Sequence, residues 1–141
     1  MKRKKKTLII TDDSTTMQNL GEKITAIMKG QQFAEYSVVI IKGKDFSATD
    51  LLPVQSFFIG CETPKAFSSL YIEDLFAHIN LAGRSCGIIS NRAGAIKYLS
   101  ALVRASEATV GKLLLAKDGT VDNMELQNWI HSIIQQGGKN E

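Results

Sequence analysis

The sequence has no long apolar run and only two cysteines among its 141 residues. No stretch approaches the roughly 18 apolar residues that cross a membrane, and the apolar run after the basic start is too short for the core of a signal peptide. Cys61 and Cys86 lie in apolar, strand-like contexts, which predicts buried reduced thiols rather than a disulfide. Two cysteines cannot form a metal site alone. We therefore expect a cytoplasmic protein without a membrane span.

The chain also has little net charge once its N-terminus is set aside. The formal charge is +3, but residues 2–6 supply five of the 17 basic side chains, which leaves 12 basic against 14 acidic residues. A near-neutral body does not favour nucleic acid as a partner. We expect residues 1–6 to form a flexible basic tail, which either keeps the terminus soluble or touches nucleic acid or an acidic lipid surface.

The remaining composition is that of a soluble globular protein, with 44% hydrophobic and 22% charged residues. A chain of this length can bury an ordinary hydrophobic core without disulfides or metal. No repeat or low-complexity segment occurs between the two termini. We expect a single domain over residues 7–136 and a flexible C-terminal tail over residues 137–141, which begins with two glycines.

Five apolar runs alternate with segments of helical periodicity, which predicts an α/β fold with a parallel sheet, right-handed crossovers and helices on both faces. The expected strands are residues 8–10, 36–41, 56–59, 85–89 and 110–116. The expected helices are residues 15–29, one turn within 48–52, residues 68–80, a helix with the inner face Ala95, Leu99, Leu102 and Val103, and a last helix from about 121 that buries Leu126, Trp129, Ile130 and Ile133.

The first helix is expected to pack Met17, Gly21, Ile24 and Met28 on the sheet. A polar loop, residues 12–16, connects it to the first strand, and α/β proteins usually build a ligand site at such a junction. Thr15 with Gln18 three residues later fits a capping box, so we expect the helix to begin at Thr15. The ligand crevice lies where the strands end, so the loops at 60–64 and 90–94 are expected to join it.

Several other side chains are assigned to structural roles. His78 and His131 have no acidic or cysteine neighbours at metal-site spacing and are expected on the surface, whereas Trp129 is expected in the core. Arg92 either meets an anionic ligand or pairs with an acidic side chain, Asp12 or Glu62, across the crevice. No nucleophile and base are arranged for hydrolysis or group transfer. We therefore assign no catalytic and no metal-binding residue, and a binding function is favoured over an enzymatic one.

Three segments together resemble those of one known family. Residues 50–63 and Leu81-Ala82-Gly83-Arg84 are two of these segments, and they resemble the third strand of flavodoxins with the loop after it, and the lead-in to the fourth strand. Residues 94–99 followed by 108–111 resemble the fourth helix and the start of the fifth strand. The resemblance implies a three-layer flavodoxin-like sandwich with a five-stranded parallel sheet in the order 2-1-3-4-5. It also implies an FMN cofactor that transfers electrons to protein partners.

By this resemblance the FMN-binding positions fall in the three loops, on Asp12, Asp13, Ser14, Thr15, Thr16, Glu62, Thr63, Ser90, Asn91 and Arg92. Flavodoxins hold the phosphate in a [Ser/Thr]-x-Thr-Gly-x-Thr loop. Here the glycine is missing and two carboxylates are present. At ~5 Å and an effective dielectric constant of ~20, one carboxylate facing one unit of phosphate charge costs about 3 kcal/mol. Flavodoxins also hold the flavin ring between aromatic side chains, and only Phe67 is near enough in sequence to serve here.

Three functional hypotheses follow. The leading one is a flavodoxin-like protein in which the FMN site is weakened or lost and which acts as a binding or regulatory module with a protein partner. The second is a working FMN electron carrier, with the phosphate, or another small anionic ligand, at residues 14–16. The third is a receiver-like module that binds a divalent cation through Asp12 and Asp13, with Ser90 and Lys117 nearby. Alternatively, the two acids only stabilise the helix dipole, by ~0.3–1 kcal/mol each.

Overall fold

The computed structural model describes residues 5–43, 45, 47–63 and 70–139. One parallel sheet contains β1 (Lys5–Thr11), β2 (Tyr36–Lys42), β3 (Ser56–Gly60), β4 (Ser85–Ser90), β5 (Thr109–Val110) and β6 (Leu114–Leu115). The strand order is β2-β1-β3-β4-β5, and β6 also pairs with β4. The helices are α1 (Thr15–Met28), α2 (Ala48–Leu51), α3 (Leu70–His78), α4 (Ala93–Arg104) and α5 (Asn123–Lys139). The expected 2-1-3-4-5 order is therefore confirmed.

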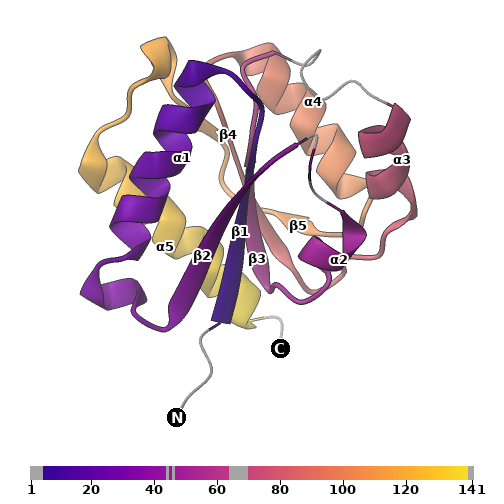
Figure 1. Ribbon diagram of the computed structural model, residues 1–141, viewed down its shortest axis with the longest axis horizontal. Coiled ribbons are helices and arrows are strands. Elements are labelled where there is room, and N and C mark those ends of the chain that lie inside the picture. The colour runs from indigo at the N-terminus through magenta and orange to yellow at the C-terminus, as the bar shows by residue number, and fades with distance from the viewer. Residues whose placement is uncertain (1–4, 44, 46, 64–69, 140–141) are drawn as a thin grey trace.

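Helices cover both faces of the sheet, and each face has its own core. Figure 1 shows α1 and α5 on one face and α2, α3 and α4 on the other. The predicted inner faces are confirmed, because the apolar stripes at helical spacing on α1, α4 and α5 are all buried against the sheet. Among the described residues, none of the helices is both long and apolar enough to cross a membrane.

Two boundaries differ from the sequence prediction. β1 begins at Lys5, since this residue pairs with Tyr36 and its N–H donates to the carbonyl of Glu35 (2.8 Å). Lys5 and Lys6 thus belong to the sheet and not to a tail. At the other end α5 continues to Lys139, through the two glycines that were expected to begin a flexible tail. Backbone pairing, which composition does not report, extends the first strand beyond its apolar run.

The fifth strand was predicted to be continuous over 110–116, and this prediction is wrong. Two short strands, β5 and β6, both pair with β4; the N–H of Gly111 still donates to the carbonyl of Cys86 in β4 (3.0 Å), and the ladder is interrupted at residues 112–113. The cause is Trp129 on α5, whose indole N–H donates to the carbonyl of Lys112 (2.6 Å). This carbonyl is thereby taken out of the strand and turned toward α5.

The approach of Trp129 to the sheet depends on a glycine in β4. A Cβ atom placed on Gly87 would lie 2.9 Å from Trp129 and 2.8 Å from Phe58, which is closer than packed atoms approach. Without that atom, the rings of Trp129 and Phe58 pack with centroids 5.2 Å apart. Cys61 and Cys86 are both buried free thiols, as predicted.

Candidate functional site

The loops that follow β1, β3 and β4 meet at the carboxyl ends of the strands. The N–H of Asp12 donates to the carbonyl of Gly60 (3.3 Å), and the N–H of Glu62 donates to Oδ2 of Asp12 (2.8 Å). The hydroxyl of Ser90 donates to the carbonyl of Cys61 (2.6 Å). The three loops singled out in the sequence are therefore held together by direct hydrogen bonds.

Asp12 is the centre of this arrangement and is only 6% exposed. Its Oδ1 accepts hydrogen bonds from the N–H (3.2 Å) and the hydroxyl (2.7 Å) of Ser14, while its Oδ2 accepts from Glu62 on the neighbouring loop. One buried carboxylate thus receives three hydrogen bonds. These hydrogen bonds from protein donors stabilise the buried negative charge of the Asp12 carboxylate.

The helix cap differs from the prediction. Ser14, and not Thr15, is the N-cap of α1, because its hydroxyl oxygen accepts from the N–H of Met17 (3.2 Å). The side chain of Gln18 does not close a capping box. Its amide nitrogen donates instead to Thr11 Oγ1 (2.9 Å) and to the carbonyl of Asp12 (2.7 Å). Asp12 and Gln18 together fix the backbone of the first loop.

Asp13 has a different environment from Asp12. Its Oδ1 lies 3.5 Å from Nζ of Lys42 at the end of β2, and both side chains are largely exposed. The two adjacent carboxylates therefore have different partners. Among the described residues, no group of three or more histidine, cysteine or acidic side chains is placed to hold a metal ion.

The loop after β4 provides one ion pair and one buried polar atom without a partner. Arg92 lies with its guanidinium 3.9 Å from Oε1 of Glu62, which confirms the predicted pairing across the crevice with Glu62 and not with Asp12. The N–H of Arg92 donates to the Ser90 hydroxyl (3.1 Å). Within the described part of the chain, the buried Oδ1 of Asn91 has no hydrogen-bond partner.

Cys61 lies beneath this cluster and is fully buried. Its burial, and to a smaller extent the nearby carboxylate of Asp12, raises the pKa of the thiol to about 12. The thiol is therefore neutral at physiological pH and is a poor nucleophile. At the end of β3, where a receiver domain would have its phosphoacceptor, the chain has this thiol.

The remaining candidate residues are less constrained. Thr15 is exposed and Thr16 is half-buried at the start of α1, and no hydrogen bond to either residue's N–H or hydroxyl is found within the described ranges. Thr63 is half-buried after β3. Phe67, the aromatic residue expected near the flavin ring, lies outside the described residues.

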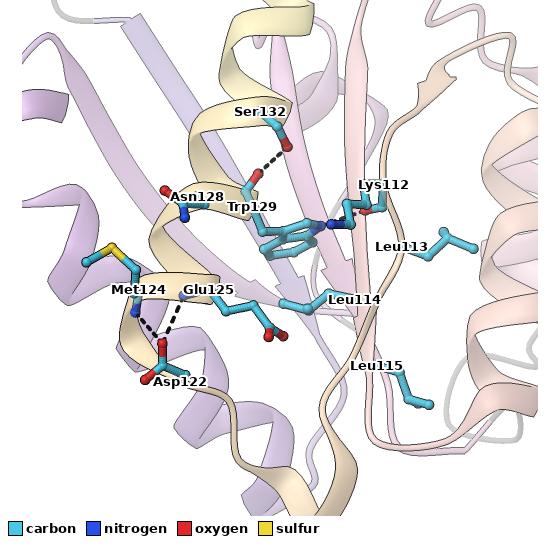
Figure 2. Close-up of a pocket in the computed structure, with 10 residues that line it drawn as sticks. All are labelled: Lys112, Leu113, Leu114, Leu115, Asp122, Met124, Glu125, Asn128, Trp129 and Ser132. Carbon is cyan, nitrogen blue, oxygen red and sulfur yellow. Dashed lines mark hydrogen bonds between the residues drawn. The ribbon is translucent and has the colours of Figure 1, made fainter.

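One feature was missed in the sequence. A cavity of about 660 Å³ lies between β6 and the first turns of α5, and its lining among the described residues includes none of residues 12–16, 60–63 and 90–92 (Figure 2). The signal for it was the run Leu113-Leu114-Leu115, because a strand with one solvent-facing side normally alternates apolar and polar residues. Three successive leucines place apolar side chains on both sides of this strand.

The sheet and loops define the class of this protein: an open, doubly wound parallel α/β sheet with its polar loops gathered at the carboxyl ends of the strands. A scan against models of known families finds no match, and a search of curated proteins finds none either. The chain nevertheless has the flavodoxin-like fold, as comparison with solved structures shows.

The similar structures are close in shape and distant in sequence. A flavodoxin from Streptococcus pneumoniae TIGR4 has a TM-score of 0.73 at 11% identity, with 93% of this chain and 98% of that chain covered. Flavodoxin 2 from Bacillus cereus has a TM-score of 0.68 at 16% identity, with 93% and 99% covered. A flavo di-iron protein from Thermotoga maritima matches 96% of this chain with 36% of its own length, at a TM-score of 0.68 and 13% identity.

Proposed function

We propose that this chain is a flavodoxin-like cytoplasmic module in which the carboxylate of Asp12 fills the phosphate position of the FMN site, so that the protein works by binding a protein partner and not as an FMN electron carrier. The observation behind the proposal is the set of three hydrogen bonds that the carboxylate accepts from Ser14 and Glu62.

The proposal follows from hydrogen-bond donors and charge. A phosphate at a helix N-terminus needs free N–H groups. Here the N–H groups of Ser14, Met17 and Glu62 already have side-chain acceptors. A phosphate dianion would also face the buried charge of Asp12, at a cost of about 3 kcal/mol for each unit of phosphate charge at ~5 Å and an effective dielectric constant of ~20. To admit the phosphate, the Asp12 carboxylate must leave its three donors.

The flavin ring has little support in the described parts of the loops. Residues 12–16, 60–63 and 90–92 contain no aromatic side chain, and the second and third of these segments are linked by the ion pair between Glu62 and Arg92. A flat apolar ring is stabilised by stacking on aromatic groups. The charged and hydroxyl side chains of these loops are better suited to contact the polar surface of a protein partner than to hold a flavin ring.

A functional FMN electron carrier is the second candidate. The observation that favours it is the start of α1, where the N–H and hydroxyl groups of Thr15 and Thr16 have no partner among the described residues, and these N–H groups belong to the positive end of the helix dipole. The receiver-like hypothesis is not favoured, because the carboxylates of Asp12 and Asp13 are directed to different partners.

The two candidates are distinguished by flavin binding. We expect the purified protein to lack stoichiometric yellow flavin absorbance, and FMN fluorescence to remain unchanged at micromolar protein. In titrations at higher protein concentration, the variant Asp12→Ser should bind FMN at least about 100-fold more tightly than the wild type, which is the equivalent of the ~3 kcal/mol for one unit of phosphate charge. The matched control Asp13→Thr should change affinity less, because Lys42 already offsets the charge of Asp13.

Two results would contradict the proposal. Stoichiometric flavin in the wild-type protein would favour the electron carrier. An unchanged FMN affinity in Asp12→Ser would show that the carboxylate is not what weakens the site.

A further inference from the structure

The exposed apolar side chains of this protein gather at one edge of the sheet. Four large apolar side chains are exposed among the described residues, and three of them belong to residues at the edge of the cavity of about 660 Å³: Leu113 (41% exposed), Leu115 (39%) and Met124 (64%). The side chains of Leu113 and Leu115 lie on one face of this edge, whereas Met124 and Trp129 line the cavity on the α5 side (Figure 2). Apolar groups concentrated in this way mark an interaction surface, whereas single exposed apolar residues need no explanation.

The same edge has unpaired backbone groups. β6 is bonded on one side only, to β4, and the N–H of Ala116 donates to the carbonyl of Ser90 (2.7 Å). Leu114 and Ala116 turn their backbone groups toward β4, so the N–H and C=O groups of Leu115 in β6, and of Leu113 directly before the strand, point out of the sheet by the alternation of an extended chain. No partner for these groups is found in the described part of the chain. An open edge of this kind readily accepts another strand.

We propose that a second copy of this chain occupies this edge, with the two β6 strands paired antiparallel about a two-fold axis at Leu114. In this register Leu113 lies opposite Leu115 of the second copy, and Leu115 lies opposite Leu113. Each pair exchanges two N–H···O=C bonds, so the outward groups of both strands are satisfied. Figure 2 shows that Leu113 and Leu115 point to the same side, away from Trp129, so the exposed leucines of the two copies would cover each other.

Charge complementarity favours a second copy over an unrelated strand. The proposed register places Lys112 of the second copy opposite Ala116, at the end of β6 that leads to the start of α5. Asp122 and Glu125 line the cavity there, and the Oδ2 of Asp122 accepts from the N–H groups of Met124 and Glu125. The two-fold axis repeats the contact, so each copy would bring one lysine to the acidic helix start of the other.

The opposite edge of the sheet is a weaker candidate. The pairing of β2 with β1 turns the N–H and C=O groups of Val38 and Ile40 outward, and no partner for them is found among the described residues. None of the exposed large apolar side chains lies on β2, however. The backbone is therefore open at both edges, but only the β6 edge combines it with exposed apolar side chains.

The proposal is tested by the oligomeric state of the full chain. In sedimentation velocity over roughly 10–500 μM protein, the weight-average mass should rise from the 15.5 kDa of one chain toward twice that value. Leu115→Lys should weaken association at least about tenfold, since it places an ammonium group in the leucine contact. The matched control is Leu52→Lys, which changes an equally exposed leucine (47%) outside the cavity and should leave association unchanged. Circular dichroism confirms that both variants are folded.

A charge swap tests the register. Lys112→Glu should weaken the dimer, and the double variant with Glu125→Lys should restore it, because the sign of both partners is then reversed. The proposal is overturned by a wild-type protein that stays monomeric up to the highest concentration, or by a dimer that survives Leu115→Lys. A dimer lost in Val38→Lys instead would assign the contact to β2 and also overturn it. None of these results depends on FMN binding.

Discussion

The carboxylate of Asp12 should make the largest single polar contribution to the end of the sheet where the candidate site lies. Replacement by asparagine keeps the shape of the side chain but removes its charge and one of its two acceptor oxygens. An asparagine can accept from Ser14 or from Glu62, but its single oxygen cannot serve both. Whichever donor is left faces an NH₂ group instead of an oxygen.

The magnitude follows from burial. A hydrogen bond to a charged group contributes ~1.5–3 kcal/mol, and a buried donor left unpaired costs ~1–3 kcal/mol. Asp12 is 6% exposed, so water cannot readily replace the lost acceptor. We expect Asp12→Asn to lower the free energy of unfolding by roughly 2 kcal/mol, and Asp12→Ala, which leaves all the donors unpaired, by roughly 3–4 kcal/mol.

Urea unfolding followed by circular dichroism measures both values. The control is Asp13→Asn, which weakens an exposed ion pair with Lys42 and should change stability by less than about 0.5 kcal/mol. Equal losses in Asp12→Asn and Asp13→Asn would refute the reasoning, because they would show that the hydrogen bonds from Ser14 and Glu62 do not stabilise the fold.

Two further predictions concern packing and pH. Gly87→Ala should lower the free energy of unfolding in urea by ~1–3 kcal/mol, because the added methyl group would overlap Trp129. The control is Gly94→Ala in the exposed first turn of α4, where a Cβ meets nothing within 4 Å, and it should raise the free energy of unfolding by up to ~1 kcal/mol. Burial raises the pKa of Cys61 from 9.0 to about 12 and that of Cys86 well above 9.0, so both thiols stay protonated in the fold at a pH where the unfolded chain loses those protons. The stability that the two protonated thiols contribute is therefore complete below pH 9 and falls as pH rises from 9 toward 12. In urea unfolding at several pH values, the free energy of unfolding of Cys61→Ala should fall less steeply over this range than that of the wild type.

Local patterns in the sequence were sufficient for the fold. Apolar residues at helical spacing identify the buried face of each helix, and β-branched runs between polar loops identify the strands. Because strands and helices alternate along the chain and their crossovers are right-handed, only a few sheet topologies are compatible with the sequence. The convergence of the three loops was predictable for the same reason, since the carboxyl ends of parallel strands share one edge.

The details that were missed depend on residues distant in sequence. Ser14 and Thr15 are both suitable N-cap residues by type. Ser14 is held in place by the Asp12 carboxylate, and this carboxylate is itself fixed by the N–H of Glu62, fifty residues after Asp12. The break in the fifth strand comes from a tryptophan 17 residues further along the chain. Neither contact leaves a local pattern, so propensity and periodicity do not detect it.

The hydrogen bonds of Asp12 also bear on how this end of the protein responds to its surroundings. A carboxylate attached to the loop is always present beside its donors, at a high effective concentration, whereas a dissolved anion is present only at the concentration the cell provides. Under the proposed function, an incoming anion would therefore have to displace a tethered competitor. The geometry of the three loops would then be set by the polypeptide itself and not by the supply of nucleotides.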